Sequence, residues 1–202
     1  EDIRTGVIGV GSMGQNHARV YSEISNLIGV ADSDEKQGRL VASRFGTKWH
    51  RDYREMLEEV DAVTVAVPTA LHRDLAEEVI SAGVHLLIEK PLAGNVKDAQ
   101  SIISLSSNAG ITLAVGHIER HNPVVKYAKE NIEEGLWNNI LTFSAARFSN
   151  YPERIRDVGV LFDLTIHDID VIRYLADSEV KSVYALGGRA RNENYEDHVN
   201  VV

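Results

Sequence analysis

Glycines at positions 9, 11 and 14 and an aspartate at position 32 have the residue types and spacing of a dinucleotide-binding site. The motif G-V-G-S-M-G follows a short apolar run and precedes a helical stretch, and a second apolar run ends next to Asp32. Gly9 permits a tight turn, Gly11 lets the backbone approach a pyrophosphate, and Gly14 lets the helix pack close to the strand. Glycine-rich turns also occur as purely structural elements. The complete order of strand, glycine turn, helix, strand and acid favours cofactor binding.

The acid and the start of the helix indicate which cofactor this is. N–H groups and the positive end of the helix dipole favour phosphates. Asp32 lies 21 residues after Gly11, close to the separation of about 20 expected of an acid that holds a ribose 2′-hydroxyl. A carboxylate there repels a 2′-phosphate, so we predict NAD rather than NADP. The predicted cofactor-binding set includes Ser12, Met13 and Ser33 beside these residues.

Two further turns follow apolar runs, where an α/β sheet places its ligands. Glu89-Lys90-Pro91 carries a lysine near the predicted cofactor pocket. Burial and a nearby positive ring favour the neutral amine, which a general base requires. A solvated Lys90 paired with Glu89 is the alternative, and the Lys90–Pro91 bond is a candidate for the cis form. The other turn contains Pro68 and Thr69, and its spacing alone favours a plain strand-to-helix connection.

The stretch VGVLFDLTIHDIDVIRY, residues 158–174, carries a carboxylate and an imidazole four residues apart. On a helix Asp163 and His167 share a face. Such a pair suits proton transfer, because the acid raises the basicity of the imidazole. A metal would need a third protein ligand, and Asp168 and Asp170 are expected to point elsewhere, so we predict no metal site. A structural salt bridge is the remaining interpretation.

Strand and helix patterns alternate through the first part of the chain. Strand-like runs cover residues 7–10, 27–31, 49–52, 61–67, 85–88 and 112–115, and helical patterns cover 35–45, 53–57, 71–82 and 96–108. This alternation predicts a right-handed, doubly wound parallel sheet of α/β class.

The pattern changes near residues 122–123. Helices are predicted over 124–134 and 161–175, and strands over 140–148, 180–187 and 197–202. Longer strands that do not alternate with helices indicate a second, α+β domain with an open, mostly antiparallel sheet. We therefore predict a Rossmann domain over 1–120 and a substrate and oligomerisation domain over 121–202. The sequence stops inside an apparent strand, so we expect this second domain to be C-terminally incomplete.

Composition narrows the classes of partner. The formal net charge is −9 and there are no cysteines. The charge argues against nucleic acid or an anionic membrane as partner, and the lack of cysteine excludes disulfides, thiolate metal sites and cysteine nucleophiles. We found neither a signal peptide nor an apolar run of about 20 residues. These features predict a cytoplasmic protein.

Five motifs in this order resemble the Gfo/Idh/MocA family of nicotinamide-dependent sugar and polyol dehydrogenases: GVGSMG with Asp32, AVPTALH, EKPL, VGHIERHNP and DVGVLFDLTIHDID. The resemblance covers nearly the whole chain. It implies a Rossmann domain followed by a mostly antiparallel α/β domain whose open sheet face mediates assembly, hence a homodimer or homotetramer. It also implies a catalytic set, Lys90, Asp163 and His167, and a cofactor border formed by Pro68, Thr69, His72, Glu89 and Lys90.

The stretch RIRDVGVLFDLTIHDID is similar to that of UDP-N-acetylglucosamine 3-dehydrogenases and related nucleotide-sugar dehydrogenases. This implies a UDP-N-acetyl sugar as substrate, bound by His167 and by Arg120 and Arg154, since arginine suits bidentate phosphate contacts. His117 stands where the family often has an aromatic residue, and His121 where it often has phenylalanine. These departures keep two alternatives open: a dehydrogenase of a free polyol or simple sugar such as inositol, and a non-catalytic NAD- or sugar-binding regulator.

Overall fold

The structure, a computed structural model, describes residues 3–149 and 158–202. The chain forms two compact units, residues 1–116 (unit 1) and 117–202 (unit 2). Their boundary precedes the predicted domain boundary by a few residues. The functions assigned to the two domains stay predictions.

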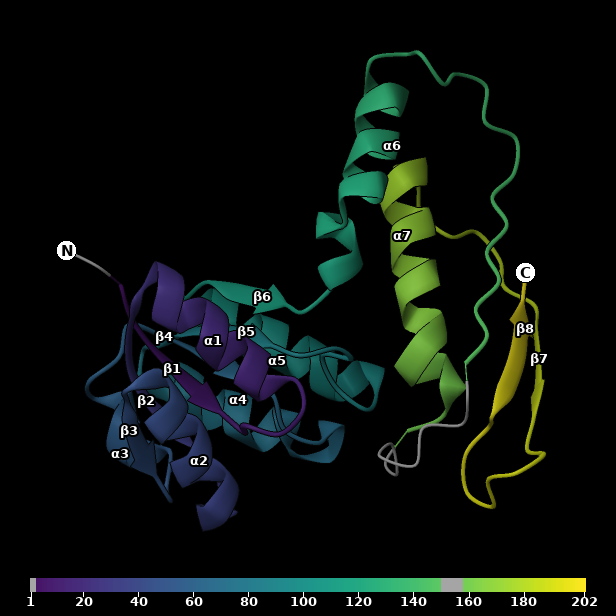
Figure 1. Cartoon of the computed structure of the whole chain (residues 1–202). Coiled ribbons are helices and arrows are strands. Elements are labelled where there is room, and N and C mark those ends of the chain that lie inside the picture. Colours follow the sequence, from purple (N-terminus) through teal and green to yellow (C-terminus); the bar gives the residue numbers. More distant parts are fainter. Residues whose placement is uncertain (1–2, 150–157) are drawn as a thin grey trace. The chain divides into compact units, whose positions relative to one another are not determined.

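Unit 1 is built on a parallel sheet, with six strands among the described residues and the order β3-β2-β1-β4-β5-β6 (Figure 1). The strands are β1 (Arg4–Ile8), β2 (Asn26–Ala31), β3 (Lys48–His50), β4 (Ala62–Val65), β5 (His85–Ile88) and β6 (Leu113–Val115). The chain winds outward from β1 in one direction and from β4 in the other, so the switch point lies between β1 and β4. The predicted doubly wound parallel sheet is confirmed.

Helices cover both faces of this sheet. They are α1 (Gly14–Ile24), α2 (Glu35–Phe45), α3 (Arg54–Leu57), α4 (His72–Ser81), which follows the 3₁₀ turn η1 (Thr69–Leu71), and α5 (Val96–Ala109). Helices α1 and α2 pack on the β1–β3 half, whereas α4 packs on β4, β5 and α5 (Figure 1). The consecutive residues Val7 and Ile8 belong to different apolar clusters, because side chains alternate across a strand. The sheet therefore has a separate core on each face.

Capping residues set several helix ends where the sequence predicts them. Asp34 accepts a hydrogen bond from the N–H of Gln37 at the start of α2, and Gly46 ends that helix with a φ of 65°. Asn95 caps α5 in the same way, and Gly110 ends it. These ends fix the connections that return the chain to the sheet.

Unit 2 contains a 3₁₀ turn η2 (Ile118–His121), helix α6 (Pro123–Glu133), a π-helical turn η3 (Leu161–Thr165) that continues into α7 (Ile166–Ala176), and strands β7 (Ala185–Gly188) and β8 (His198–Val201). Helices α6 and α7 pack together (Figure 1), and β7 and β8 form an antiparallel pair. The predicted second domain with an antiparallel sheet is confirmed, with a two-stranded sheet in the described residues.

Residues 140–148 are a correction to the sequence analysis, because they do not form the predicted strand. A strand requires a neighbouring strand to pair its N–H and C=O groups, and among the described residues of unit 2 only β7 and β8 pair. Leu141 and Phe148 are accordingly 92% and 93% exposed. The strand predicted from residue 180 begins only at Ala185.

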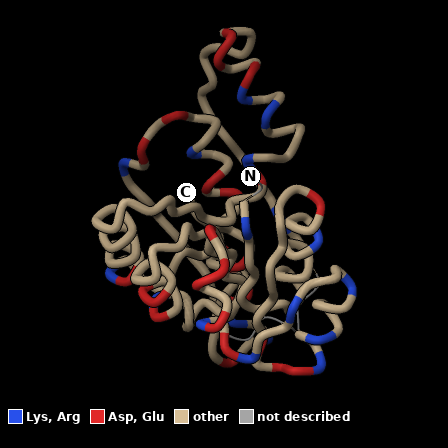
Figure 2. Tube along the Cα trace, turned by 90° about the vertical axis from the view of Figure 1, so that its left-hand side faces the viewer, with Lys and Arg blue, Asp and Glu red and all other residues tan. Residues whose placement is uncertain are grey.

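Charges of both signs are interspersed along the described trace (Figure 2). This distribution agrees with the negative net charge and with the absence of a basic cluster from the sequence. Within the described parts of the chain, no helix combines the length and the apolar character needed to cross a membrane.

Candidate active site

The predicted cofactor residues of unit 1 gather at one edge of its sheet. The segments that follow the carboxyl ends of β1, β2, β4 and β5 carry the glycine turn, Asp32, the Pro68-Thr69 turn and the Glu89-Lys90 turn. Because parallel strands all end at the same edge, the structure brings these segments together there. Ligands of open α/β sheets bind outside this edge.

The three glycines of the first turn differ in what surrounds them. Gly9 has a φ of +83°, a left-handed conformation that favours glycine. A Cβ on Gly14 would overlap the carbonyl oxygen of Gly9, so this position permits the close approach of α1 to β1. A Cβ on Gly11 would meet no atom within 4 Å. Gly11 therefore faces open space, as expected of a backbone that a ligand approaches.

The carboxylate of Asp32 is held beside this turn by two backbone donors. Its Oδ2 accepts a hydrogen bond from the N–H of Val10 at 2.8 Å, and its Oδ1 accepts one from the N–H of Asp34 at 2.9 Å. Asp32 is partly exposed, and the adjoining Ser33 is exposed. A fixed, accessible carboxylate next to the glycine turn has the position required to accept hydrogen bonds from ribose hydroxyls.

The start of α1 has the features of a phosphate-binding site. Gly11, Ser12 and Met13 are exposed, and the Met13 side chain makes no capping hydrogen bond. The N-terminal N–H groups of a helix lack partners within the helix, and the dipole adds a positive partial charge there. The residues present thus fit a dinucleotide: an open glycine turn and a helix start for the pyrophosphate, and a carboxylate for the ribose.

The Glu89-Lys90-Pro91 turn is tied to α1. Glu89 is buried, 7% exposed, and its Oε1 accepts a hydrogen bond from Nε2 of His17 at 2.7 Å. Its Oε2 accepts a weaker bond from the N–H of Lys90 at 3.2 Å. Burial raises the pKa of Glu89, but the bond and charge of His17 and the contacts with Lys90 outweigh it, so that the pKa lies below its ordinary value. Lys90 is half-buried, and the Lys90–Pro91 peptide is cis.

A second histidine links this turn to the one after β4. His72 is 1% exposed, its Nδ1 lies 2.9 Å from the carbonyl oxygen of Pro91, and its Nε2 lies 2.9 Å from that of Val67. Pro68 and Thr69 lie between Val67 and α4, and Thr69 begins η1. Both ring nitrogens of His72 therefore engage protein atoms, and its predicted contact with the cofactor stays a prediction.

In unit 2, Asp163 and His167 lie on one continuous helical segment. Asp163 is in the π-helical turn η3, is 7% exposed, and its N–H donates to the carbonyl oxygen of Gly159 at 3.0 Å. His167 is in the first turn of α7 and is partly exposed. Single π turns inside α-helices are frequent at functional sites. The two residues are four positions, about one helical turn, apart on this segment, and their pairing in proton transfer stays a prediction.

Arg120 has a carboxylate partner that the sequence analysis did not assign. Its Nε and Nη2 donate to the two oxygens of Asp170 at 2.8 and 2.6 Å, and Asp170 is only 7% exposed. These hydrogen bonds raise the pKa of Arg120. Nδ1 of His117 lies 3.8 Å from the same carboxylate. To bind a substrate phosphate, Arg120 would have to use Nη1 or give up its pair with Asp170.

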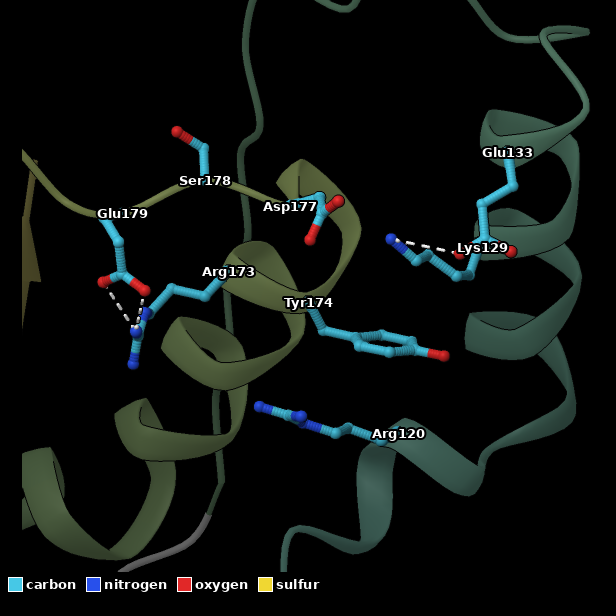
Figure 3. Close-up of a pocket in the computed structure, with 8 residues that line it drawn as sticks. All are labelled: Arg120, Lys129, Glu133, Arg173, Tyr174, Asp177, Ser178 and Glu179. Carbon is cyan, nitrogen blue, oxygen red and sulfur yellow. Dashed lines mark hydrogen bonds and ion pairs between the residues drawn. The ribbon is translucent and has the colours of Figure 1, made fainter.

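A hollow of about 440 Å³ lies between α6 and α7 (Figure 3), and it is lined by Arg120, Lys129, Glu133, Arg173, Tyr174, Asp177, Ser178 and Glu179. The Arg120 guanidinium and the Lys129 ammonium lie 5.2 and 5.3 Å from the ring centre of Tyr174. Lys129 also pairs with Glu133, and Arg173 with Glu179. The basic side chains that line the hollow are therefore largely balanced by acidic neighbours. None of the predicted catalytic residues lines the hollow.

The predicted site residues thus fall into two groups. The cofactor set and Lys90 belong to unit 1, whereas Asp163, His167 and Arg120 belong to unit 2. Arg154 lies outside the described residues. Sequence reasoning missed the bond from His17 to Glu89. The available signal was a charged residue directly after a buried strand, which needs a partner of opposite charge.

The family models match almost the whole chain. The model of the Gfo/Idh/MocA oxidoreductase family, described as an NAD-binding Rossmann fold, matches residues 3–117. The model of the GFO/IDH/MocA C-terminal domain matches residues 125–202.

Relatives and solved structures agree with these matches. UDP-N-acetylglucosamine 3-dehydrogenase of Acidithiobacillus ferrooxidans is 36% identical over 92% of this chain and 58% of its own length. A solved structure of that enzyme, GnnA, superposes with a TM-score of 0.84 at 34% identity, over 98% of this chain and 62% of the other.

Myo-inositol 2-dehydrogenase of Thermotoga maritima is 34% identical over 92% of this chain and 58% of its own length. The WlbA dehydrogenase of Bordetella pertussis, solved with NADH and UDP-GlcNAcA, has a TM-score of 0.86 at 26% identity, over 100% of this chain and 66% of the other. The chain thus spans about three fifths of the length of these curated relatives. It belongs to the Gfo/Idh/MocA family of oxidoreductases.

Proposed function

We propose that the complete protein is an NAD-dependent dehydrogenase that transfers a hydride between a secondary hydroxyl of a sugar ring and nicotinamide. The observation that carries this proposal is the carboxyl edge of unit 1, where the open glycine turn, Asp32 and the Lys90 turn follow neighbouring strand ends. Family membership supports it, since the relatives include named dehydrogenases of a nucleotide sugar and of inositol.

The residues of unit 1 would hold the cofactor as follows. The Gly9–Gly14 turn and the start of α1 would bind the pyrophosphate, and Asp32 would accept hydrogen bonds from the ribose. The negative charge of Asp32 would exclude a 2′-phosphate and thus favour NAD. Pro68, Thr69, His72 and Glu89 would border the nicotinamide side. Bound NAD would supply the hydride acceptor.

The proton of the substrate hydroxyl would pass to Lys90 or to His167. Lys90 is half-buried in the turn that follows β5, at the carboxyl edge of the sheet. Asp163, on the same helical face as His167, would orient the imidazole and stabilise its protonated form. Single substitutions of Lys90 and of His167 would separate these two candidate bases.

A UDP-N-acetyl sugar is the substrate we propose. It is supported by the named activity of the Acidithiobacillus relative and by the ligand in the Bordetella structure. Arg120, Arg154 and His167 would contact it. A free polyol is the second candidate, because the Thermotoga relative is an inositol dehydrogenase and because Asp170 already engages the fork of Arg120. A non-catalytic regulator would have little need of a lysine, an aspartate and a histidine at the three catalytic positions.

The test is NADH formation by the complete protein with UDP-N-acetyl sugars and with polyols, in the wild type and in Lys90→Ala and His167→Ala variants. Lys97→Ala, which changes an exposed lysine on α5, is the matched control. Turnover of a UDP-N-acetyl sugar that is lost in a catalytic variant but kept in the control would support the proposal. Turnover of polyols alone would exclude the nucleotide sugar. NAD binding without any turnover would favour the regulator, and failure to bind NAD would contradict the whole proposal.

We also propose that the protein acts in the cytoplasm as a homodimer or homotetramer, with neither nucleic acid nor a membrane as partner. Assembly is supported by apolar side chains that unit 2 exposes, including Val183, Tyr184 and Leu186 on and beside β7. Light scattering of the purified complete protein would give its mass. A monomer at micromolar concentration would contradict the proposed assembly.

A further inference from the structure

Lys90 lies between two residues that are each bound by a histidine from another part of unit 1. We propose that His17 and His72 are positioning residues for Lys90, with His17 acting through the carboxylate of Glu89 and His72 through the carbonyl of Pro91. This inference rests on the proposed role of Lys90 in proton transfer. It gives both histidines a function in catalysis without contact with the substrate.

The first contact fixes Glu89 from the side of α1. The imidazole of His17, in the first turn of α1, donates from Nε2 to Oε1 of Glu89 at 2.7 Å, and the two side chains are only 17% and 10% exposed. Oε2 of Glu89 accepts the N–H of Lys90 at 3.2 Å. The carboxylate therefore bridges the helix that begins at the cofactor turn and the backbone of the proposed base.

The surroundings of Glu89 leave its side chain little freedom. A Cβ on Gly116 would come within 3.0 Å of Oε2, so the backbone after β6 already lies close to the carboxylate. A buried carboxylate without a hydrogen-bonding partner is unfavourable. Loss of the His17 N–H would thus drive Glu89 to rotate toward water or to take up a proton. Either change weakens its bond to the Lys90 backbone.

The second contact fixes the residue on the other side. His72, at the start of α4, is 1% exposed, and its ring spans the carbonyl oxygens of Pro91 and Val67, each 2.9 Å from a ring nitrogen. Carbonyl oxygens only accept, so the ring donates to one of them when neutral and to both when protonated. His72 thereby connects the turn after β5 with the turn after β4.

The contacts of His17 and His72 hold the residues on either side of Lys90, and so fix the backbone position of Lys90. Lysine has a long, flexible stem, so the position of its amine depends on the backbone from which it extends. Misplacement of a reacting group by about 1 Å costs on the order of a hundredfold in rate. We therefore expect each histidine to affect the chemical step more than the binding of NAD.

The experiment compares His17→Leu and His72→Leu, which lose the donor, with His17→Gln and His72→Gln, which keep an N–H donor. His85→Leu is the control, because His85 lies at the opposite end of β5 and is exposed. We expect the leucine variants to lower kcat by about ten- to a hundredfold and to change the NAD dissociation constant by a smaller factor. With substrate deuterated at the carbon that gives up the hydride, the isotope effect on kcat should rise in these variants. The glutamine variants should recover most of kcat. A purely structural role would lower thermal stability and leave the isotope effect of the folded fraction unchanged.

A second readout does not depend on turnover. Lysines are methylated with a ¹³C label, and the Lys90 resonance is assigned by its loss in Lys90→Arg. In the leucine variants we expect it to shift toward the position of exposed lysines, and in the glutamine variants to stay near the wild-type position. If the leucine variants left both the resonance and kcat unchanged, the inference would be wrong. If no substrate were turned over but the resonance moved as expected, the proposed function would fail while the positioning would stand.

Discussion

Substitutions of Gly11 and Gly14, in the same turn, should separate effects on stability from effects on cofactor binding. Gly14→Ala and Gly11→Ala add the same methyl group three residues apart. At Gly14 the new Cβ would overlap the carbonyl oxygen of Gly9, and at Gly11 it would meet no protein atom within 4 Å. We therefore expect the first substitution to damage the fold and the second to damage cofactor binding alone.

The magnitudes follow from these surroundings. Overpacking at Gly14 forces α1 away from β1 and costs about 1–3 kcal/mol, which corresponds to a Tm lower by about 2–4 °C per kcal/mol for a chain of this size. Gly11 does not have the positive φ that would strain an alanine, so Gly11→Ala should leave Tm unchanged or raise it slightly, by the ~0.4–1 kcal/mol gained from a less flexible unfolded chain.

NAD binding should be weakened by the substitution at Gly11. A methyl group on Gly11 would enter the space proposed for the pyrophosphate and remove at least one hydrogen bond to a charged group, worth about 1.5–3 kcal/mol. The NAD dissociation constant should then rise by about ten- to a hundredfold. Calorimetric titration with NAD and thermal unfolding without NAD measure the two effects separately. Wild-type NAD affinity in Gly11→Ala would refute the placement of the pyrophosphate, and an unchanged Tm in Gly14→Ala would refute the described packing of α1.

Three further predictions concern carboxylates. Asp32→Ala should weaken NAD binding and improve NADP relative to NAD by at least about tenfold (~1.4 kcal/mol), as measured by titration with both cofactors; an unchanged ratio would contradict its role. Asp170→Asn should destabilise the protein by about 1.5–3 kcal/mol in urea unfolding, less than for a fully buried pair because the Arg120 side chain is 42% exposed. The lowered pKa of Glu89 means that its contribution to stability is complete above about pH 4.3 and is lost as the pH falls through the lower folded-state value. Glu89→Gln should therefore flatten the fall of Tm between neutral and acidic pH, and an unchanged slope would show that His17 does not hold an ionised carboxylate.

The parallel sheet of unit 1 was predictable because its determinants are local. Each strand is a short apolar run, and each connection carries its own turn or cap residue, such as Asp34 and Gly46 around α2. The predicted bounds of that helix, residues 35–45, match the structure. The three glycines also have the surroundings that their spacing predicts.

The strands of unit 2 were less predictable because strand formation depends on partners. Residues 140–148 have a pattern typical of a strand but no neighbour with which to pair among the described residues. The helix that carries Asp163 and His167 was predicted, whereas its π-helical first turn was not. Hydrophobic periodicity does not distinguish a single wider turn from an α-helical one.

The partners of His17 and Arg120 could not be predicted from residue types. The sequence analysis predicts a substrate phosphate as the partner of Arg120 and assigns no partner to His17. The structure gives each of them a buried carboxylate far along the chain, Glu89 for His17 and Asp170 for Arg120. A buried acid must be paired, so the burial of Glu89 and Asp170 requires a basic partner for each of them. Glu89 adjoins the proposed base Lys90, whereas Asp170 lies within α7. The pair of His17 therefore bears on the proposed catalytic turn, and the pair of Arg120 connects η2 with α7.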